Sequence, residues 1–432
     1  MQLDAQKSIC AALSTITATL LGSGAAAAPG ANTLDSSILL YSESGRVKIA
    51  EGVFDYGRQL GDERSIGLRL TLDALTGASP NGATPASGIQ TFTSPSGGGS
   101  YTVGAGTIPL DDTFEDIRGA LDASLRESLD RITFLNVGGH LSLERDYTSF
   151  GANVGITRDF DRKNTTLGLS AAYSHDIVSP YGGAPEPFVS MPPPDDDGGE
   201  EEGEDEGEDD APGESKDVVD GVFTLTQVID RKTIVRMNYS LSWSTGYLND
   251  PYKIVSVVYD RGSATPGEPA DYVFESRPDS RSKQAIFGDV RRAIAGSALD
   301  LSYRYFWDDW GITSHTADVS LRLPVGGEHY LEPHFRWYRQ SEADFYAPYI
   351  IDGQAFPDHA SADSRLAEFD AYTYGLRYAF PVATGFRMSL TAEYYTQKGK
   401  RAPPEDFGVL SRYDLFPELD AYMVRVGFSH GF

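Results

Sequence analysis

The sequence predicts an all-β fold: a transmembrane, antiparallel, up-and-down β-barrel of about sixteen strands, with about fourteen as the alternative. Residues 420–432 alternate between apolar and small or charged side chains, and the chain ends on Phe432. After the N-terminal segment, no stretch reaches the roughly 18 apolar residues of a spanning helix. A closed barrel is the other structure that pairs every backbone polar group within lipid. The connections between the predicted strands also alternate between short and long.

Residues 1–27 have the features of a secretory signal peptide. Lys7 precedes an apolar stretch over 9–21, and small residues follow up to Ala28. This order predicts cleavage near Ala27, which leaves a mature barrel of residues 28–432. The one cysteine, Cys10, lies in the predicted signal peptide, so the mature protein is expected to contain no disulfide and no cysteine-bound metal.

Alternating or partly alternating segments predict the strands in order. In residues 233–245, for example, Val235, Met237 and Tyr239 alternate with polar residues, as one face of a strand requires. The predicted strands are 36–41, 47–57, 65–74, 116–126, 132–145, 147–158, 164–175, 218–229, 233–245, 281–294, 298–307, 314–323, 330–340, 366–380, 386–398 and 420–432.

The lengths of the connections predict the orientation. Short turns are expected at 58–64, 127–131, 159–163, 230–232, 295–297, 324–329 and 381–385. The long connections, at 75–115, 176–217, 246–280, 341–365 and 399–419, all fall on the opposite side. Bacterial barrels have short periplasmic turns and long outer loops. We therefore expect a bacterial outer-membrane location with the C-terminus in the periplasm.

Charged side chains recur on the strand face opposite the apolar one. A wide barrel holds water, so such charges remain solvated or pair across the wall. They predict a salt-bridged lumen, with a charge-selective pore lining as the sharper alternative. The predicted lumen-lining residues are Arg69, Asp73, Arg118, Asp122, Arg236, Asp300, Arg304, Asp318, Arg322, Arg377, Arg387, Glu393 and Arg425.

Two long connections have distinctive compositions. Residues 176–217 are predicted to form a disordered outer loop, since 195–217 holds fourteen carboxylates and one lysine. Weak cation capture at Asp195, Asp196, Asp197, Glu200, Glu201 and Glu202 is the alternative to a purely solvated loop. Residues 75–115 are rich in Gly, Ser, Thr and Pro but include Ile89, Phe92, Tyr101 and Ile108. This connection either folds inward and constricts the pore or lies exposed, and the sequence leaves both open.

No catalytic, cofactor-binding or defined metal site is predicted. Asp308, Asp309 and His315 near one predicted rim are similar to the acidic pair and histidine of outer-membrane aspartyl-type proteases, but a second supporting dyad is missing. His140 and Ser142 share a strand face at a spacing that suits proton transfer poorly. An enzyme is therefore not expected.

Four segments carry a family resemblance. They are residues 70–83 (Leu-Thr-Leu-Asp-Ala-Leu-Thr-Gly-Ala-Ser-Pro-Asn-Gly-Ala), 109–114 (Pro-Leu-Asp-Asp-Thr-Phe), 303–312 (Tyr-Arg-Tyr-Phe-Trp-Asp-Asp-Trp-Gly-Ile) and 360–366 (Ala-Ser-Ala-Asp-Ser-Arg-Leu). They resemble a widespread bacterial family of uncharacterised outer-membrane proteins, a domain-of-unknown-function group. The resemblance implies a barrel with no agreed substrate. It also implies that members occur together with flavin-attachment and thioredoxin-like periplasmic proteins, and therefore have redox-related partners.

The expected function is passive passage of an unknown small solute through a charged aqueous lumen. A stoppered structural or receptor barrel that presents its outer loops is the alternative, and a rim hydrolase is less favoured. Expected partners are outer-membrane lipid and the barrel-assembly machinery, which would read Phe432, Phe428 and Val426. The formal charge of −27 argues against nucleic acid.

Overall fold

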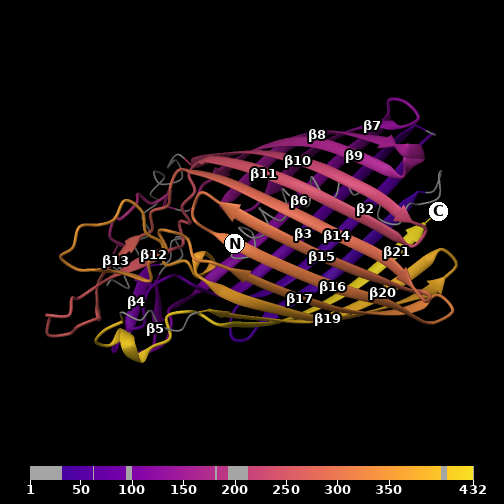
Figure 1. The fold of residues 1–432 in the computed structure, drawn as a ribbon. Coiled ribbons are helices and arrows are strands. Elements are labelled where there is room, and N and C mark those ends of the chain that lie inside the picture. Colours follow the sequence, from indigo (N-terminus) through magenta and orange to yellow (C-terminus); the bar gives the residue numbers. More distant parts are fainter. Residues whose placement is uncertain are drawn as a thin grey trace, which may run out of the picture.

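The barrel predicted from the sequence is confirmed (Figure 1). The computed structural model describes residues 32–61, 63–93, 100–180, 182–192, 213–399 and 406–431. Within these residues, sixteen strands close into one antiparallel barrel. They are β1 (Thr33–Glu43), β2 (Lys48–Leu60), β3 (Arg64–Pro80), β6 (Leu110–Ser128), β7 (Thr133–Leu143), β8 (Tyr147–Phe160), β9 (Thr165–Val178), β10 (Glu214–Asp230), β11 (Thr233–Gly246), β14 (Ser280–Ile294), β15 (Ser297–Asp308), β16 (Thr313–Gly326), β17 (His329–Gln340), β19 (Phe369–Ala383), β20 (Phe386–Gly399) and β21 (Leu419–Gly431).

The first and last strands close the barrel. β1 pairs with β21 in continuous antiparallel register from Thr33 opposite Gly431 to Glu43 opposite Ala421. Every other strand pairs with the wall strands before and after it, so no edge stays open. Each of the sixteen predicted segments overlaps one of these strands, because most strands of the wall alternate between apolar and polar residues.

The bounds of two predicted loops were wrong. β3 runs on to Pro80 and β6 begins at Leu110, so the connection predicted at 75–115 is 81–109. The acidic connection predicted at 176–217 is likewise shorter, since β9 reaches Val178 and β10 begins at Glu214. Glu214 lies opposite Val178 in the ladder, so acidic residues at this end take part in the strand. Backbone pairing is independent of side-chain charge, and alternation fades where both faces meet water.

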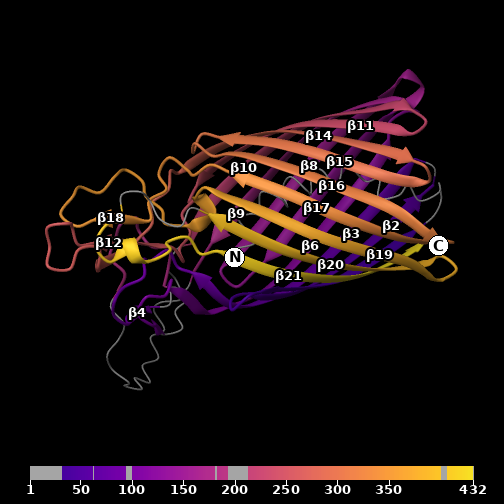
Figure 2. The same ribbon diagram turned by 60° about the horizontal axis from the view of Figure 1, so that its bottom comes forward.

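The long connections build a folded unit beyond one end of the barrel (Figures 1 and 2). We call this unit the cap, and define it as residues 81–93, 100–109, 182–192, 247–279, 341–368 and 406–418. It holds five short strands in two small sheets. They are β4 (Gln90–Thr93), β5 (Ser100–Val103), β12 (Ile254–Val258), β13 (Pro269–Phe274) and β18 (Tyr349–Ile351). None of them was predicted, because segments of three to six residues are too short to show a period.

Apolar side chains are distributed differently in the cap and the wall. Phe92, Val255 and Val258 of the cap are 0% exposed, and cluster with residues from other connections. On the wall, large apolar residues such as Leu40 and Ile117 remain exposed on one face of their strands. The described residues contain no helix long and apolar enough to span a membrane.

Candidate functional site

The charged face of the wall is the first candidate site. Alternation on β3 separates the exposed Leu68, Leu70 and Leu72 from Arg69 and Asp73. The register extends this division to the neighbouring strands, since partners across a ladder share a face. All thirteen residues predicted to line the lumen lie on the face opposite the exposed apolar band. In a membrane barrel the apolar band meets lipid, which puts these charges on the inner face.

Most of the predicted lumen residues form ion pairs with residues that the sequence prediction omitted. Arg69 Nε lies 2.6 Å from Asp55, and Arg236 Nε lies 2.7 Å from Asp289. Further such pairs are His140–Asp122 (2.8 Å), Arg291–Asp300 (2.6 Å), Arg322–Glu332 (2.7 Å) and Arg387–Glu328 (3.3 Å). Arg118 and Asp73, which were both predicted, pair with each other at 2.5 Å. Alternation alone would have placed most of these partners on the inner face. Which neighbour each one meets depends on the register.

His334 joins three strands of the inner face. Its Nε2 lies 2.9 Å from Asp318 on β16, and its Nδ1 lies 3.1 Å from Glu393 on β20. Arg336 Nε also lies 2.9 Å from Asp318. This cluster was missed because a single histidine on a strand gives no signal until its neighbours are known. Two other guanidiniums lie over aromatic rings: Arg304 over Phe306 and Arg377 over Tyr330. Arg425 lies opposite Thr391 in the ladder, and Thr391 in turn lies opposite Arg377.

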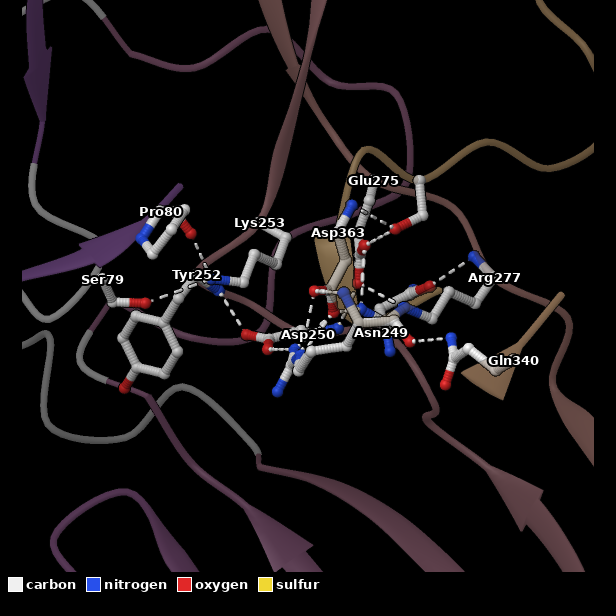
Figure 3. A network of polar contacts seen from close by, with 12 residues as sticks. Ser79, Pro80, Asn249, Asp250, Tyr252, Lys253, Glu275, Arg277, Gln340 and Asp363 are labelled. Carbon is white, nitrogen blue, oxygen red and sulfur yellow. Dashed lines mark hydrogen bonds and ion pairs between the residues drawn. The ribbon is translucent and has the colours of Figure 1, made fainter. Parts of the chain in front are cut away.

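The second candidate site is a buried ion network within the cap (Figure 3). Arg277 Nη2 lies 2.8 Å from Asp363 and 3.0 Å from Glu275. Arg365 pairs with both Asp363 and Asp250. The members come from the β11–β14 and β17–β19 connections, so the network ties two distant parts of the chain together. A buried charge requires such partners, because its desolvation is otherwise unfavourable.

Local sequence places Asp363 for this role. It precedes the 3-10 turn η2 (Ser364–Leu366), and its carboxylate accepts the Arg365 backbone N–H at 3.0 Å. Burial alone raises the pKa of Asp363, but the Arg365 and Arg277 guanidiniums outweigh burial and hold this pKa well below its usual range. Burial raises the pKa of Glu275 and lowers the pKa of Lys253. The network therefore keeps Asp363 charged.

Lys253 links this network to the end of β3. Its Nζ donates to the Pro80 carbonyl, and the next residue, Ile254, donates its backbone N–H to Asn81 O at 2.9 Å. Ser361 Oγ donates to Glu275, and Trp310 Nε1 donates to Ser280 O at 2.9 Å. The cap therefore gathers the 360–366 segment and the end of the 70–83 segment, and the 303–312 segment ends at the rim beside it.

The rim does not assemble the acid–histidine pair of a hydrolase. Asp308 shares the inner face with Arg304 and pairs with Arg281, whereas His315 lies opposite Tyr305 on the outer face. Asp309 accepts the Ser282 backbone N–H at 2.8 Å. Since Asp308 and His315 occupy opposite faces of the wall, they cannot share a proton. Among the described residues, no group of three His, Cys, Asp or Glu side chains could hold a metal ion.

Other predicted features are placed in part. Phe428 and Val426 lie on the outer face of β21 beside β1, where Val426 is opposite Ile38. Phe432, the signal segment 1–27, Cys10 and the six carboxylates considered for cation capture lie outside the described residues. Phe92 and Tyr101, from the connection that was expected either to constrict the pore or to lie exposed, instead pack with Ile254 in the cap.

One family model matches residues 6–430, and its description is "Protein of unknown function (DUF3570)". No curated protein matches the chain. Among solved structures, a mutant of the ferric enterobactin receptor PfeA from Pseudomonas aeruginosa is 10% identical, with a TM-score of 0.40, over 87% of this chain and 54% of the receptor. The chain thus spans about half of that receptor's length.

Two further structures are similar at the same level. A bacterial polysaccharide outer membrane secretin is 8% identical, with a TM-score of 0.43, over 94% of this chain and 99% of the other. The CymD monoaromatic hydrocarbon channel is 7% identical, with a TM-score of 0.40, over 94% and 89%. At such identities and scores, nothing about a ligand or partner carries over to this chain.

Proposed function

The chain belongs to the DUF3570 family of proteins of unknown function, and we propose that this member is an outer-membrane barrel that passes small solutes through a charged aqueous lumen. The observation that carries the proposal is the two-faced wall: a closed sixteen-strand barrel with an exposed apolar band on one face and ion-paired charges on the other. A soluble barrel would gain nothing from an outer face of this kind, whereas lipid requires it.

Water in the lumen is supported by barrel size and side-chain exposure. Barrels of about sixteen strands leave an aqueous channel rather than a packed core. The Arg322 and Arg336 side chains of the inner face are 48% and 53% exposed, even though both are paired with carboxylates. Side chains of this exposure leave room for solvent beside the wall.

The cap controls entry in this proposal. It lies at the end that carries all the long connections, which is the outer end in bacterial barrels. The turns at the opposite end, together with the start of β1 and the end of β21, then lie in the periplasm. A solute reaches the lumen only past or through the cap, so the cap is expected to reduce the conductance of the barrel.

Planar bilayers test the proposal. The full chain is expected to show discrete conductance steps, and deletion of residues 87–105 should enlarge them, because this segment supplies Phe92 and Tyr101 to the cap. Deletion of residues 195–212 is the matched control and should mainly change cation preference. Heat-modifiable gel mobility reports that each barrel has folded. Silent bilayers from folded protein, with and without residues 87–105, would reject a channel.

A stoppered receptor barrel is the second candidate. The buried network of Asp250, Arg277, Asp363 and Arg365 favours it, because such a network gives the cap a defined surface that a partner could read. The full chain and the variant without residues 87–105 would then both show no conductance in bilayers. The full chain, with its intact cap, would capture a specific surface partner. Loss of that capture on deletion of residues 87–105 would support this function over a channel.

A further inference from the structure

We propose that the lumen is electrically polarised across its width, and that its preferred solutes are small zwitterions carrying a separated ammonium and carboxylate group. This inference rests on the channel function proposed above and names the solute class. It comes from the order of the strands around the barrel together with the charges on their inner faces.

Strand order identifies the walls that oppose each other. In the closed sequence of sixteen strands, β11 lies eight places from β1, and β14 lies eight places from β2. In a closed barrel of sixteen, strands eight places apart are diametrically opposite. The β1–β2 wall therefore faces the β11–β14 wall across the lumen.

The β1–β2 wall is acidic. Its inner face carries Asp35, Glu43, Glu51 and Asp55, on the side of the wall away from exposed apolar residues such as Ile38. Both strands are fully described, and their inner faces hold no lysine or arginine. Asp55 meets its cation, Arg69, only on the next strand, β3. The inner face of this wall is therefore negative as a whole.

The β11–β14 wall is basic. Its inner face carries Arg236, Arg281, Lys283 and Arg291, with Asp289 as its one carboxylate. Asp289 pairs with Arg236, while Asp300 and Asp308 of the next strand, β15, pair with Arg291 and Arg281.

Arg304 of β15 adds to the positive charge of this side. Its guanidinium lies 5.6 Å from the centre of the Phe306 ring, and among the described residues it forms no ion pair with a carboxylate. The two opposing sides of the lumen thus differ in the sign of their net charge.

An acidic and a basic side chain of the two sides both lie near the cap end of their strands. Glu51 is near the start of β2 (Lys48–Leu60), and Arg304 is near the end of β15 (Ser297–Asp308). Both of these strand ends meet the cap. The polarised zone is therefore the part of the lumen just beneath the cap, where an entering solute first meets the wall.

Such a zone favours dipoles over single charges. Low-dielectric walls focus the field between opposite charges into the water of the lumen. An ion of either sign is attracted by one wall and repelled by the other. A zwitterion gains at both walls, since its ammonium turns toward the acids and its carboxylate toward the guanidiniums.

Liposome swelling with size-matched solutes tests the inference on the full chain. Alanine is the zwitterion, and lactamide is a neutral probe of nearly the same shape. At about 10 mM salt, where the Debye length is about 30 Å, alanine should enter roughly tenfold faster than lactamide. At about 1 M salt, where the Debye length is about 3 Å, the two rates should converge.

Paired variants separate polarisation from net charge. E51Q/R304Q leaves the lumen charge unchanged and should remove the alanine advantage with no shift in reversal potential. E51R/R304E restores opposite charges with reversed polarity and should restore the advantage, because a zwitterion can align either way. The control K48Q/E115Q makes the same charge changes on the exposed outer face and should have no effect.

The outcomes distinguish this inference from the channel function. Entry of neither solute would overturn the channel function itself. Equal entry of alanine and lactamide at low salt would overturn only the polarised lumen. An alanine advantage that survives E51Q/R304Q in a correctly folded barrel would also overturn it.

Discussion

Arg365 of the β17–β19 connection donates to Asp250 of the β11–β14 connection, 115 positions earlier in the chain, inside a cap where the two side chains are only 15% and 12% exposed. The same guanidinium holds Asp363, which also accepts from Arg277. These ion pairs join the β11–β14 and β17–β19 connections at one point. This arrangement makes the cap a folded unit with its own stability, separate from the hydrogen-bonded wall.

Replacing Arg365 with Met should loosen the cap without opening the barrel. The change leaves Asp250 and Asp363 buried with fewer cationic partners, and breaking a buried pair in this way costs about 3–5 kcal/mol. Hydrogen exchange should rise in residues 247–279 and 341–368 but not in β6 to β9. Arg412→Met, at an exposed position of the cap, is the control and should leave exchange unchanged. Equal protection in both variants would mean that the network does not hold the cap.

Acid should release the cap through Asp363. Its folded pKa lies below the ordinary value, so its contribution to stability is complete above about pH 4 and is lost as the pH falls through the folded pKa. Pepsin should therefore begin to cut the two connections only well below pH 4. In Asp363→Asn, which has no such carboxyl to protonate, the cutting rate, corrected for pepsin activity, should lose this acid-dependent step. A step that persists in the variant would assign it to another group.

Truncating Phe92, at the apolar centre of the cap, should loosen the cap, as replacing Arg365 should. Phe92 is fully buried against Tyr101, Ala83 and Ile254, and a Phe→Ala change at such a site costs about 3–5 kcal/mol through lost contacts and a cavity. Phe92→Ala should raise the conductance of the barrel and the exchange of β12. Ile89→Ala removes an apolar side chain that is 75% exposed, and should change neither quantity measurably.

Gly82 should tolerate no side chain. Its φ is +99°, and a Cβ there would lie 2.3 Å from the Ile254 carbonyl oxygen, so Gly82→Ala must move the 81–109 connection away from β12. Gly45 is the matched control, because its φ is +71° but a Cβ would meet nothing within 4 Å. Gly45→Ala should cost only the left-handed backbone term of about 1–2 kcal/mol. Similar protease resistance of the two variants would show that the close approach to Ile254 can relax.

The sequence alone determined the wall of this protein. Strand alternation has a period of two and depends only on which face meets water, so residues 233–245 or 420–432 disclosed their strands without any neighbour. The alternation of long and short connections predicted the up-and-down order, because each strand reverses direction and successive connections therefore lie at opposite ends of the barrel. The inner-face charges followed from this alternation.

Tertiary structure alone decided the partners and the cap. His334 meets Asp318 and Glu393 because of the ladder register, and a register is a relation between strands that a single strand does not contain. Asp250, Arg277 and Arg365 looked like ordinary loop charges until residues more than eighty positions apart packed together and removed most of the water from them. Burial depends on contacts distant in sequence, so composition cannot separate a solvated loop charge from one that holds a domain together.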